Sequence, residues 1–429
     1  MAPKIAPVQT STDMPASTTV VVIGGGIVGL TAALTLSERG IPVVLLEKGR
    51  IAGEQSSRNL GWIRKMGRSA PDVPMAMESD RLWAEMPQRV SGDVGYRQAG
   101  IMYLARTEAE MAMHEGWMRS VGDLDLDSRM LTPADVDRLV PDGQGRWAGG
   151  IYTPSDGRAE PTLASSAIAI AAMKRGAVII ENCAVRTLSF TGGRVSGVVT
   201  EKGEIRCQEV LLCGGLWSRR FLGNLGVSLP TLPLICSVIR TAPMEGPTEI
   251  AVGGPDFSFR KRADGGFTIT QRGGLDAPLT LDHLLIGRRY LPALRSQRHY
   301  LRLSLGKDFF SLAMPRRWKG TGTSPFERVR TMDPPANEAL NAEAMRNLTA
   351  AWPVFEKAVI EDVWAGMMDI TPDSLPVIGP VDGIAGLTVA SGFSGHGFGT
   401  SPAAGQLAAD LVTAATPIID PTPYRLDRF

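Results

Sequence analysis

The amino-acid sequence predicts an α/β protein with a Rossmann-type dinucleotide-binding domain, built on a parallel central sheet, and a second domain with an antiparallel sheet. Two observations support this prediction. A β-α-β pattern with a glycine-rich turn occupies residues 18–48, and short β-branched segments joined by tight turns recur over residues 236–275. With 429 residues, the chain is long enough for two or three domains.

The β-α-β pattern is the clearest local signal in the chain. The apolar segment Thr19–Ile23 predicts a buried strand, residues 30–39 predict a helix that stops at Gly40, and residues 42–47 predict a second buried strand. Two parallel strands joined by a helix require a right-handed crossover, and helices then cover both faces of such a sheet. This unit therefore predicts the parallel central sheet.

The motif Gly24-x-Gly26-x-x-Gly29 lies between the first strand and the helix. Gly24 allows a tight turn, Gly26 lets the backbone approach a pyrophosphate, and Gly29 lets the helix pack closely on the strand. Glu47 ends the second strand, 23 residues after Gly24, where its carboxylate can accept hydrogen bonds from an adenosine ribose. The motif predicts a dinucleotide site but leaves open whether the ligand is NAD or FAD.

Further elements follow along the chain. A strand is expected over 96–105, and helices are expected over 108–120, 133–139 and 162–174. Short strands are then expected over 177–181, 184–191, 194–200 and 205–213. The antiparallel sheet over 236–275 contains a hairpin at residues 263–266, so this region is predicted to form the second domain.

Composition excludes several classes of protein. The 45 Lys and Arg residues balance 44 Asp and Glu residues, and 44% of residues are hydrophobic, so neither a disordered chain nor a nucleic-acid-binding protein is expected. Four cysteines have neither a CxxC pair nor zinc-ligand spacing. We therefore expect no metal site, no disulfide framework and a cytoplasmic location.

The N-terminal 17 residues lack the apolar core of a signal peptide and are predicted to be a flexible leader. No segment approaches the roughly 18 apolar residues of a membrane span. Residues 280–319 contain nine Lys or Arg and two acids. We interpret this basic stretch as a solvated face, and the alternative is contact with an anionic surface such as lipid headgroups.

Near the C-terminus, residues 391–405 contain five glycines, and Pro402 is expected to open an alanine-rich helix that runs to Ala414. The bare backbone and the helix N-terminus can face an anion, such as the charge that develops on a reduced flavin. His396 lies in this segment. A lone histidine in a glycine loop is interpreted as a positional hydrogen-bonding residue, with proton transfer as the alternative.

These motifs, taken together, resemble the D-amino-acid-oxidase superfamily of FAD enzymes. The resemblance rests on the N-terminal β-α-β unit, Gly53–Asn59, Trp364–Gly366, Asp373–Gly379 and Ser391–Gly405. Within that superfamily, further segments resemble the bacterial L-amino-acid deaminases and the related L-arginine oxidase/dehydrogenases. They are Arg50–Ser56, Asn182–Arg186, Trp217–Arg219 with Gly223–Gly226, and Ile419–Phe429.

The resemblance implies a domain organisation and a cofactor site. Residues 18–90, 150–235 and 355–429 would form the FAD-binding domain, and residues 91–149 and 236–354 the substrate-binding domain. The FAD would be non-covalent, because no cysteine follows residue 236. Beyond the glycine motif and Glu47, the implied cofactor-binding residues are Lys48, Ser56, Ser57, Val185, Gly214, Gly215, Gly366, Gly392, Gly395, His396, Gly397 and Gly399.

The resemblance also implies a reaction, the oxidative deamination of L-amino acids to 2-oxo acids and ammonia by hydride transfer from Cα to flavin N5. Arg272 aligns with the arginine that binds the substrate carboxylate, and Trp364 would form a pocket wall. Met367 and Met368 are expected to line the pocket. The alternation of residues 267–272 places Arg272 on the same strand face as Thr268 and Thr270.

L-Arginine and other cationic amino acids are the first choice of substrate, with Asp369, Glu54 or Asp156 as the carboxylate that would pair with the side chain. Large apolar L-amino acids, or another amine or imino acid, are the alternatives. The rivals from other classes are an NAD-dependent dehydrogenase and an FAD-bound interaction protein. The sequence leaves open whether oxygen or a quinone accepts the electrons and whether the chain forms a homo-oligomer.

Overall fold

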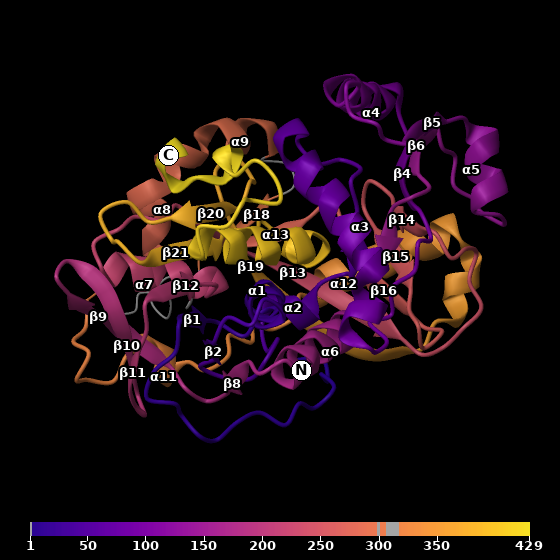
Figure 1. Cartoon of the computed structure of the whole chain (residues 1–429). Helices are drawn as coiled ribbons and strands as arrows, with labels where there is room; N and C mark the ends of the chain where they lie inside the picture. Colours follow the sequence, from indigo (N-terminus) through magenta and orange to yellow (C-terminus); the bar gives the residue numbers. More distant parts are fainter. Residues whose placement is uncertain (1, 298–300, 306–316) are drawn as a thin grey trace.

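The computed structural model describes residues 2–297, 301–305 and 317–429. Its strands form two main sheets, and Figure 1 shows the first beneath and around the yellow helix α13, with the second extending towards the upper right. The described chain therefore has the α/β architecture that the sequence predicts.

The first sheet has six strands in the order β20-β21-β12-β1-β2-β8. All neighbouring pairs are parallel except β20 with β21. Every residue of β1 and β2 is buried, because helices cover the sheet. The strands are β1 (Val20–Ile23), β2 (Val43–Leu46), β8 (Val178–Ile180), β12 (Glu209–Leu212), β20 (Val377–Pro380) and β21 (Leu387–Ser391).

Four helices pack around this sheet. Helix α1 packs against both α13 and α6, and α13 also packs against α3. Figure 1 shows α13 directly beside α1 at the centre of the molecule, although the two are far apart in the sequence. The bounds are α1 (Ile27–Glu38), α3 (Val73–Val90), α6 (Pro161–Lys174) and α13 (Gly397–Val412).

The second sheet is largely antiparallel, and only the pairs β4–β14 and β17–β18 are parallel. This arrangement confirms the predicted fold class. Its strands are β4 (Ile101–Ala105), β5 (Arg129–Leu131), β6 (Gly149–Thr153), β13 (Leu232–Thr241), β14 (Ala251–Gly253), β15 (Ser258–Lys261), β16 (Phe267–Thr270), β17 (Leu275–Pro278), β18 (Leu301–Ser304) and β19 (Ile360–Ile370).

Smaller elements complete the described chain. Strands β9 (Val185–Thr191), β10 (Arg194–Thr200) and β11 (Gly203–Arg206) form a three-stranded sheet, and β3 (Trp62–Ile63) pairs with β7 (Gly157–Arg158). The other α-helices are α2 (Gln55–Arg58), α4 (Glu108–Ser120), α5 (Pro133–Leu139), α7 (Ser218–Asn224), α8 (Leu281–Ile286), α9 (Leu291–Gln297), α11 (Pro325–Arg328) and α12 (Glu338–Ala351).

Two predicted elements differ in their boundaries. The strand expected over 205–213 is divided into β11 and β12, because the first part pairs with β10 and the second with β1. The segment 355–429, predicted to belong with the cofactor-binding domain, begins with β19, which pairs with β13 from Leu232 to Thr241. Strand β19 therefore belongs to the second sheet and leads the chain from that sheet back to the first.

Residues 2–17, expected to be a flexible leader, make defined contacts with the first domain. The hydroxyl of Ser166 donates to the carbonyl oxygen of Ala6 at 2.7 Å, and the backbone N–H of Ser11 donates to the carbonyl oxygen of Ile179 at 2.9 Å. Figure 1 shows this indigo segment running beneath β8 before it enters β1. The segment is therefore held along α6 and β8.

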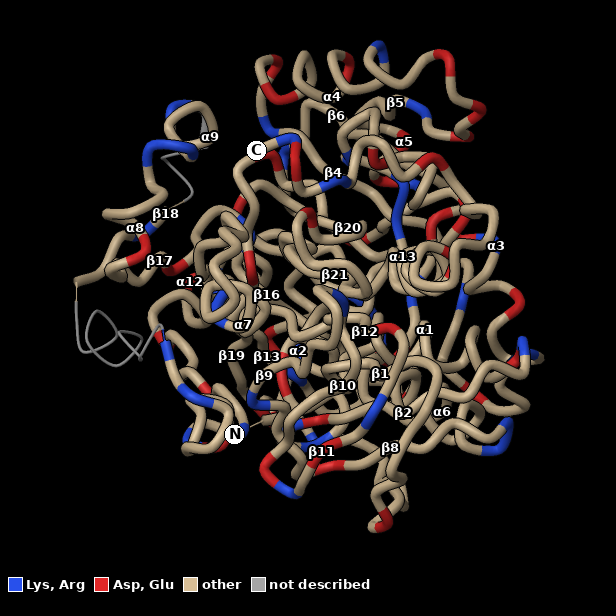
Figure 2. The backbone as a smooth tube through the Cα atoms, turned by 60° about the vertical axis from the view of Figure 1, so that its left-hand side comes forward, with Lys and Arg blue, Asp and Glu red and all other residues tan. Residues whose placement is uncertain are grey.

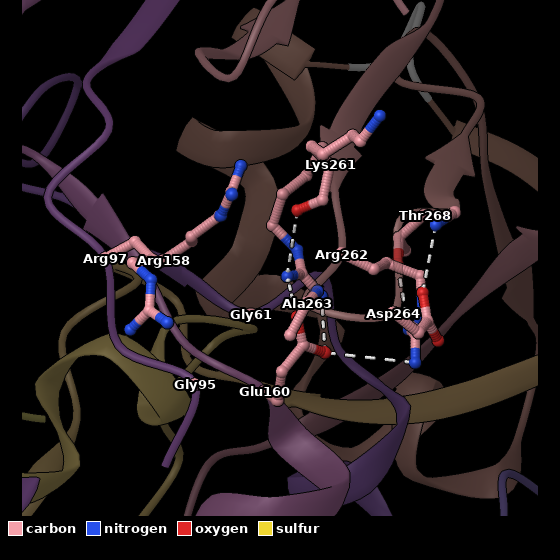
Figure 3. Close-up of polar contacts among 12 residues, drawn as sticks. Gly61, Gly95, Arg97, Arg158, Glu160, Lys261, Arg262, Ala263, Asp264 and Thr268 are labelled. Atoms are coloured by element: carbon pink, nitrogen blue, oxygen red, sulfur yellow. Dashed lines mark hydrogen bonds and ion pairs between the residues drawn. The ribbon is translucent and has the colours of Figure 1, made fainter. Parts of the chain in front are cut away.

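A buried ion pair joins the two domains (Figure 3). The guanidinium of Arg260 in β15 donates through Nη1 to Oε1 of Glu160 at 2.6 Å, and Glu160 immediately precedes α6. The backbone N–H of Ala263 donates to the same oxygen at 3.0 Å. Gly61 lies against the pair, where a Cβ would meet Cζ of Arg260 at 3.2 Å. This contact fixes the second sheet relative to the first.

Part of the basic stretch 280–319 lies outside the described residues, including Arg298, Lys307 and Arg316. In the described part, Leu284 and Leu285 are 78% and 57% exposed. Figure 2 shows basic residues on α9 at one edge of the molecule. Within the described chain, no helix is long and apolar enough to cross a membrane, and contact with a lipid surface stays a prediction.

Candidate active site

A cavity of about 790 Å³ lies where the two sheets meet, and both sheets contribute residues to its wall. Its size is in the range of small-molecule and cofactor sites. One end is formed by the glycine-rich turn and Glu47, and the N-terminus of α13 and residues of β13, β16 and β19 also line it. We call the wall formed by the glycine-rich turn, Glu47, β19 and the N-terminus of α13 the cofactor part, and the wall formed by residues of β3, β4, β13 and the segment after β16 the chamber.

The glycine-rich turn at the end of β1 has the geometry that its sequence predicts. Gly24 has φ +112°, and a Cβ there would lie 2.4 Å from the carbonyl oxygen of Cys213. A Cβ at Gly29 would lie 2.2 Å from the carbonyl oxygen of Gly24, so Gly29 acts in packing and does not line the cavity. Gly26 lines the cavity, where a side chain would occupy the space beside the first turn of α1.

Glu47 is held rigidly at the same end of the cavity. Its Oε2 accepts from the backbone N–H of Gly25 and its Oε1 from that of Gly49, each at 2.7 Å. Burial raises the pKa of the Glu47 carboxyl. Two fixed oxygens at this position are suited to accept hydrogen bonds from ribose hydroxyls.

Lys48 also lines the cavity, but its ammonium group is used within the loop. It donates to Glu54 at 3.0 Å and to the carbonyl oxygen of Arg330 at 2.8 Å, and it lies 4.2 Å from the ring centroid of Trp217. Lys48 therefore stabilises the cavity wall through protein contacts, and its predicted contact with the cofactor stays a prediction.

The two predicted phosphate-loop serines face different ways. Ser56 lines the cavity, and its hydroxyl oxygen accepts from the backbone N–H of Ile27 at 2.9 Å. Ser57 is buried and lies outside the described cavity lining, with its hydroxyl 3.4 Å from the carbonyl oxygen of Glu54. Successive residues of α2 point in different directions, so the helix brings Ser56, but not Ser57, to the cavity.

Three more predicted cofactor residues lie on the wall next to this turn. Val185 begins β9, and Gly214 and Gly215 follow β12. Gly215 has φ +51°, which favours glycine. The carboxyl ends of the parallel strands β1 and β12 therefore meet at the cofactor part of the cavity, as expected for ligands of open α/β sheets.

Helix α13 begins earlier than the sequence predicts. It starts at Gly397, with Pro402 inside the helix and not at its opening. Gly395, Gly397 and Gly399 line the cavity, so free N–H groups of the first turn lie at the wall. This shift moves the positive end of a 16-residue helix to the glycine-rich segment itself, where an anionic group is favoured.

His396 precedes the first residue of α13 and lines the cavity. Burial, together with the guanidinium groups of Arg68 and Arg64, lowers its pKa well below the ordinary value. Its Nδ1 is buried and has no hydrogen-bond partner among the described residues. The ring is therefore neutral at pH 7, which suits a hydrogen-bonding role and makes it a weak base.

Strand β19 delivers Gly366, Met368 and Asp369 to the cavity wall. Met367 points to the opposite face, where it packs with Ile235 and Ala365, so the predicted pocket role of Met367 does not match its position. Trp364 also lies outside the described lining; its Nε1 donates to the carbonyl oxygen of Arg58 at 3.0 Å. Strand alternation therefore separates the two methionines.

Asp369 is buried and lies beside the segment that leads to α13. Its Oδ2 accepts from the backbone N–H of Gly392 at 2.8 Å, and Gly392 itself is outside the cavity lining. Burial raises the pKa of the Asp369 carboxyl to about 6, against the lowering effect of the backbone N–H of Gly392 and of the Gln55 side chain. Gln55 and Glu54 are its neighbours, so Asp369 belongs to the cofactor part of the cavity.

Arg272 lies in the chamber next to the cofactor part. Strand β16 ends at Thr270, so Arg272 follows the strand and the predicted alternation does not extend to it. Its Nη1 donates to the carbonyl oxygens of Gly253 and Gly254 at 3.3 and 3.2 Å. Its guanidinium carbon lies 3.7 Å from the ring centroid of Tyr103, in a cation–π contact.

The other predicted partners for a cationic side chain are already used or lie elsewhere. Oε1 of Glu54 accepts from Lys48 at 3.0 Å and from the backbone N–H of Met332 at 2.9 Å. Asp156 lies outside the described lining, and its Oδ1 accepts from the backbone N–H of Lys65 at 2.8 Å. Neither carboxylate is therefore placed to meet a substrate guanidinium.

Several residues of the chamber were not found from the sequence, because no motif connects them. They come from β3, β4, β13 and the segment after β16, and they include Trp62, Arg64, Tyr103, Cys236 and Gln271. Arg64 follows the Gly53–Asn59 motif closely, which is the one sequence signal that pointed near it. Burial raises the pKa of the Cys236 thiol, so it is a poor nucleophile.

These features define a dinucleotide-binding protein whose cavity also offers a chamber for a small molecule. A bare-backbone turn, a fixed carboxylate and a helix N-terminus line one cavity, as a dinucleotide with a charged redox ring requires. The family model described as FAD dependent oxidoreductase matches residues 19–411. The chain belongs to this family of FAD-dependent oxidoreductases.

Known proteins agree with this assignment. The structure of L-amino acid deaminase from Proteus myxofaciens in complex with anthranilate is 33% identical and covers 99% of this chain and 96% of that chain, with a TM-score of 0.94. The L-amino acid deaminase from Proteus vulgaris is 32% identical, covers 98% and 100%, and has a TM-score of 0.93. A glycine oxidase from Pseudomonas aeruginosa is 28% identical over 94% of this chain and 97% of the relative.

Proposed function

We propose that this protein oxidises the Cα–N bond of L-α-amino acids to an imino acid, which water then hydrolyses to a 2-oxo acid and ammonia. The observation that carries this proposal is that Arg272 and the N-terminus of α13 line the same cavity. An arginine fork can hold a carboxylate through two hydrogen bonds, and the helix N-terminus favours the negative charge of a reduced redox ring. The similarity to the Proteus L-amino acid deaminases supports the same reaction.

The residues of the cofactor part fit FAD. Glu47 would hold the ribose, Gly26 and the first turn of α1 would face the pyrophosphate, and Gly395 to Gly399 would face the isoalloxazine. When bound, FAD supplies the two-electron oxidant that takes up the hydride from Cα. Burial raises the pKa of the Cys213 and Cys236 thiols, the two cysteines that line the cavity, which supports non-covalent binding.

In this proposal Arg272 fixes the substrate by its carboxylate and thereby orients Cα–H towards the cofactor. The contact with Tyr103 and the bonds to two backbone carbonyls restrict the guanidinium before substrate binds. Positioning of this kind accounts for a large part of many rate enhancements. No side-chain base is needed if the amine loses its proton before C–H cleavage, and the neutral His396 would be a weak one.

The substrate side chain is not defined by these contacts alone. L-Arginine was the first choice from the sequence, but it would need a carboxylate in the chamber. Asp369 lies beside Gln55 and Glu54 in the cofactor part, and the charged residues of the chamber include Arg64 and Arg272. We therefore do not extend the proposal to arginine, and we treat large apolar L-amino acids as the main alternative.

The test is anaerobic reduction of the bound flavin. We expect the yellow purified protein to be bleached by at least one L-amino acid and not by its D-enantiomer. A protein that no amino acid or amine bleaches would be an FAD-bound interaction protein. Reoxidation by oxygen or by a soluble quinone then identifies the electron acceptor.

A further inference from the structure

Two arginines lie close to one aromatic ring in the chamber. The guanidinium carbon of Arg272 is 3.7 Å from the ring centroid of Tyr103, and that of Arg64 is 5.9 Å from the same centroid. All three side chains line the cavity. The two guanidinium carbons are therefore separated by no more than the sum of these two distances, so one small ligand can reach both.

Two glycines, Gly67 and Gly253, leave the space in which the two arginines pack beside Tyr103. A Cβ at Gly67 would lie 3.0 Å from Cε2 of Tyr103 and 3.3 Å from Nη1 of Arg64. A Cβ at Gly253 would lie 2.8 Å from Cδ1 of Tyr103 and 3.0 Å from Nη1 of Arg272. The two guanidinium groups are thus held towards opposite edges of the ring, each against a glycine.

The guanidinium of Arg64 forms no ion pair with a carboxylate of the described chain. Its Nη1 donates to the carbonyl oxygen of Met66, and none of the described acids forms an ion pair with it. The neighbouring Arg68 differs, because its Nη1 bonds to Asp72 at 3.0 Å. The chamber therefore carries a positive charge at Arg64 that a ligand can neutralise.

Two further observations indicate an anionic ligand. The indole Nε1 of Trp62, a donor on the same wall, is buried and has no hydrogen-bond partner in the part of the chain that the structure describes. Burial lowers the pKa of His396, and the guanidinium groups of Arg68 and Arg64 lower it further. The two arginines thus add a positive potential at the wall that carries His396.

We infer that the substrate is an L-amino acid with a second carboxylate in its side chain, of the glutamate or aspartate class. Arg272 binds the α-carboxylate, as in the proposed function on which this inference rests, and Arg64 binds the side-chain carboxylate. The carboxyl carbons of such an acid are about 4–5 Å apart in an extended chain. With a charge-assisted bond of about 2.8 Å at each end, the acid spans the space between the two arginines.

The experiment compares pairs of substrates that differ in charge but hardly in shape. Anaerobic flavin reduction by the holoenzyme is measured with L-Glu and L-Gln, with L-Asp and L-Asn, and with L-Leu. We expect kcat/KM for L-Glu or L-Asp to exceed that of the matching amide by about 10- to 150-fold, the range for losing hydrogen bonds to a charged group.

The variant Arg64→Met should remove this preference. Its kcat/KM for the acid should fall by about 10- to 150-fold, while the value for the amide stays within a factor of about 3, and Arg64→Lys should restore part of the loss. Arg146→Met is the matched control, because Arg146 is exposed and lies outside the cavity lining. It should leave all five values unchanged.

The outcomes separate this inference from the proposed function. If L-Gln or L-Leu bleaches the flavin as fast as L-Glu, and L-Asn as fast as L-Asp, the dicarboxylate inference is overturned while amino-acid oxidation stands. Equal losses for acid and amide in Arg64→Met would also overturn it. If the variant fails to bind FAD, the wild-type comparison of acid with amide still decides. If no amino acid bleaches the flavin, both proposals fail.

Discussion

The carboxylate of Glu160 and the guanidinium of Arg260 form an ion pair inside the protein, with Nη1 2.6 Å from Oε1 and both side chains at most 4% exposed (Figure 3). The pair connects the start of α6 to β15, so it joins the FAD-binding sheet to the sheet that carries the chamber. The ion pair thereby contributes to the relative position of the two sheets that line the cavity.

Glu160→Gln should destabilise the protein strongly. It leaves the Arg260 charge buried without its partner, which costs about 3–5 kcal/mol. Urea unfolding followed by circular dichroism measures the loss. Glu249→Gln is the matched control, because Glu249 also pairs with an arginine, Arg158, but is 66% exposed. A loss no larger than that of the control would show that the buried pair is not important for stability.

Gly26→Val should abolish FAD binding while the protein still folds. Apart from its chain neighbours, one atom of the described residues lies within 4 Å of a Cβ at this position, Oγ of Ser56 at 3.2 Å, so the added side chain would occupy the space expected for the pyrophosphate. The flavin content of the purified protein is the measurement. Gly223→Val, at a glycine with no heavy atom within 4 Å of its Cβ position, should keep full occupancy. A yellow, fully occupied Gly26→Val protein would refute the dinucleotide site.

Arg272→Ala should raise KM sharply and lower kcat/KM. The substrate carboxylate loses charge-assisted bonds worth about 1.5–3 kcal/mol each. Arg272→Lys should recover only part of the loss, because a point charge cannot reproduce the planar fork. Steady-state kinetics with the best L-amino acid decides, and unchanged kcat/KM in Arg272→Ala would remove Arg272 from the substrate site.

Asp156 should make stability depend on pH. Burial raises its carboxyl pKa from 3.8 to about 6 in the folded protein. Because the folded pKa is the higher one, this residue favours folding below the unfolded pKa, and that contribution is lost as pH rises through the folded pKa. Over this window the unfolding free energy of wild type should fall by about 3 kcal/mol relative to Asp156→Asn.

Urea unfolding at several pH values between about 4 and 7 measures this difference. Asp125→Asn, at an exposed carboxylate, is the control and should show no such trend. A constant offset between wild type and Asp156→Asn across the whole range would contradict the raised pKa, whereas an offset that changes with pH supports it.

The cofactor part of the site could be predicted from the sequence because its chemistry is local. Gly24, Gly26 and Glu47 lie within one β-α-β unit, where backbone geometry fixes their relative positions whatever the rest of the chain does. The fold class followed for the same reason, since hydrophobic periodicity and turn residues specify each element separately. Arg272 was found through resemblance to a family.

The tertiary structure alone decided the rest. Met368 and not Met367 reaches the cavity, and Ser56 and not Ser57, because strand pairing and helix rotation determine which side chain points inward. Tyr103 and Arg272 lie far apart in the sequence and meet through the pairing of β4 with β14, of β14 with β15 and of β15 with β16. Arg64 follows β3, which pairs with β7. The positive charge of the chamber thus depends on how the sheets assemble. It cannot be predicted from the local sequence pattern of any one segment.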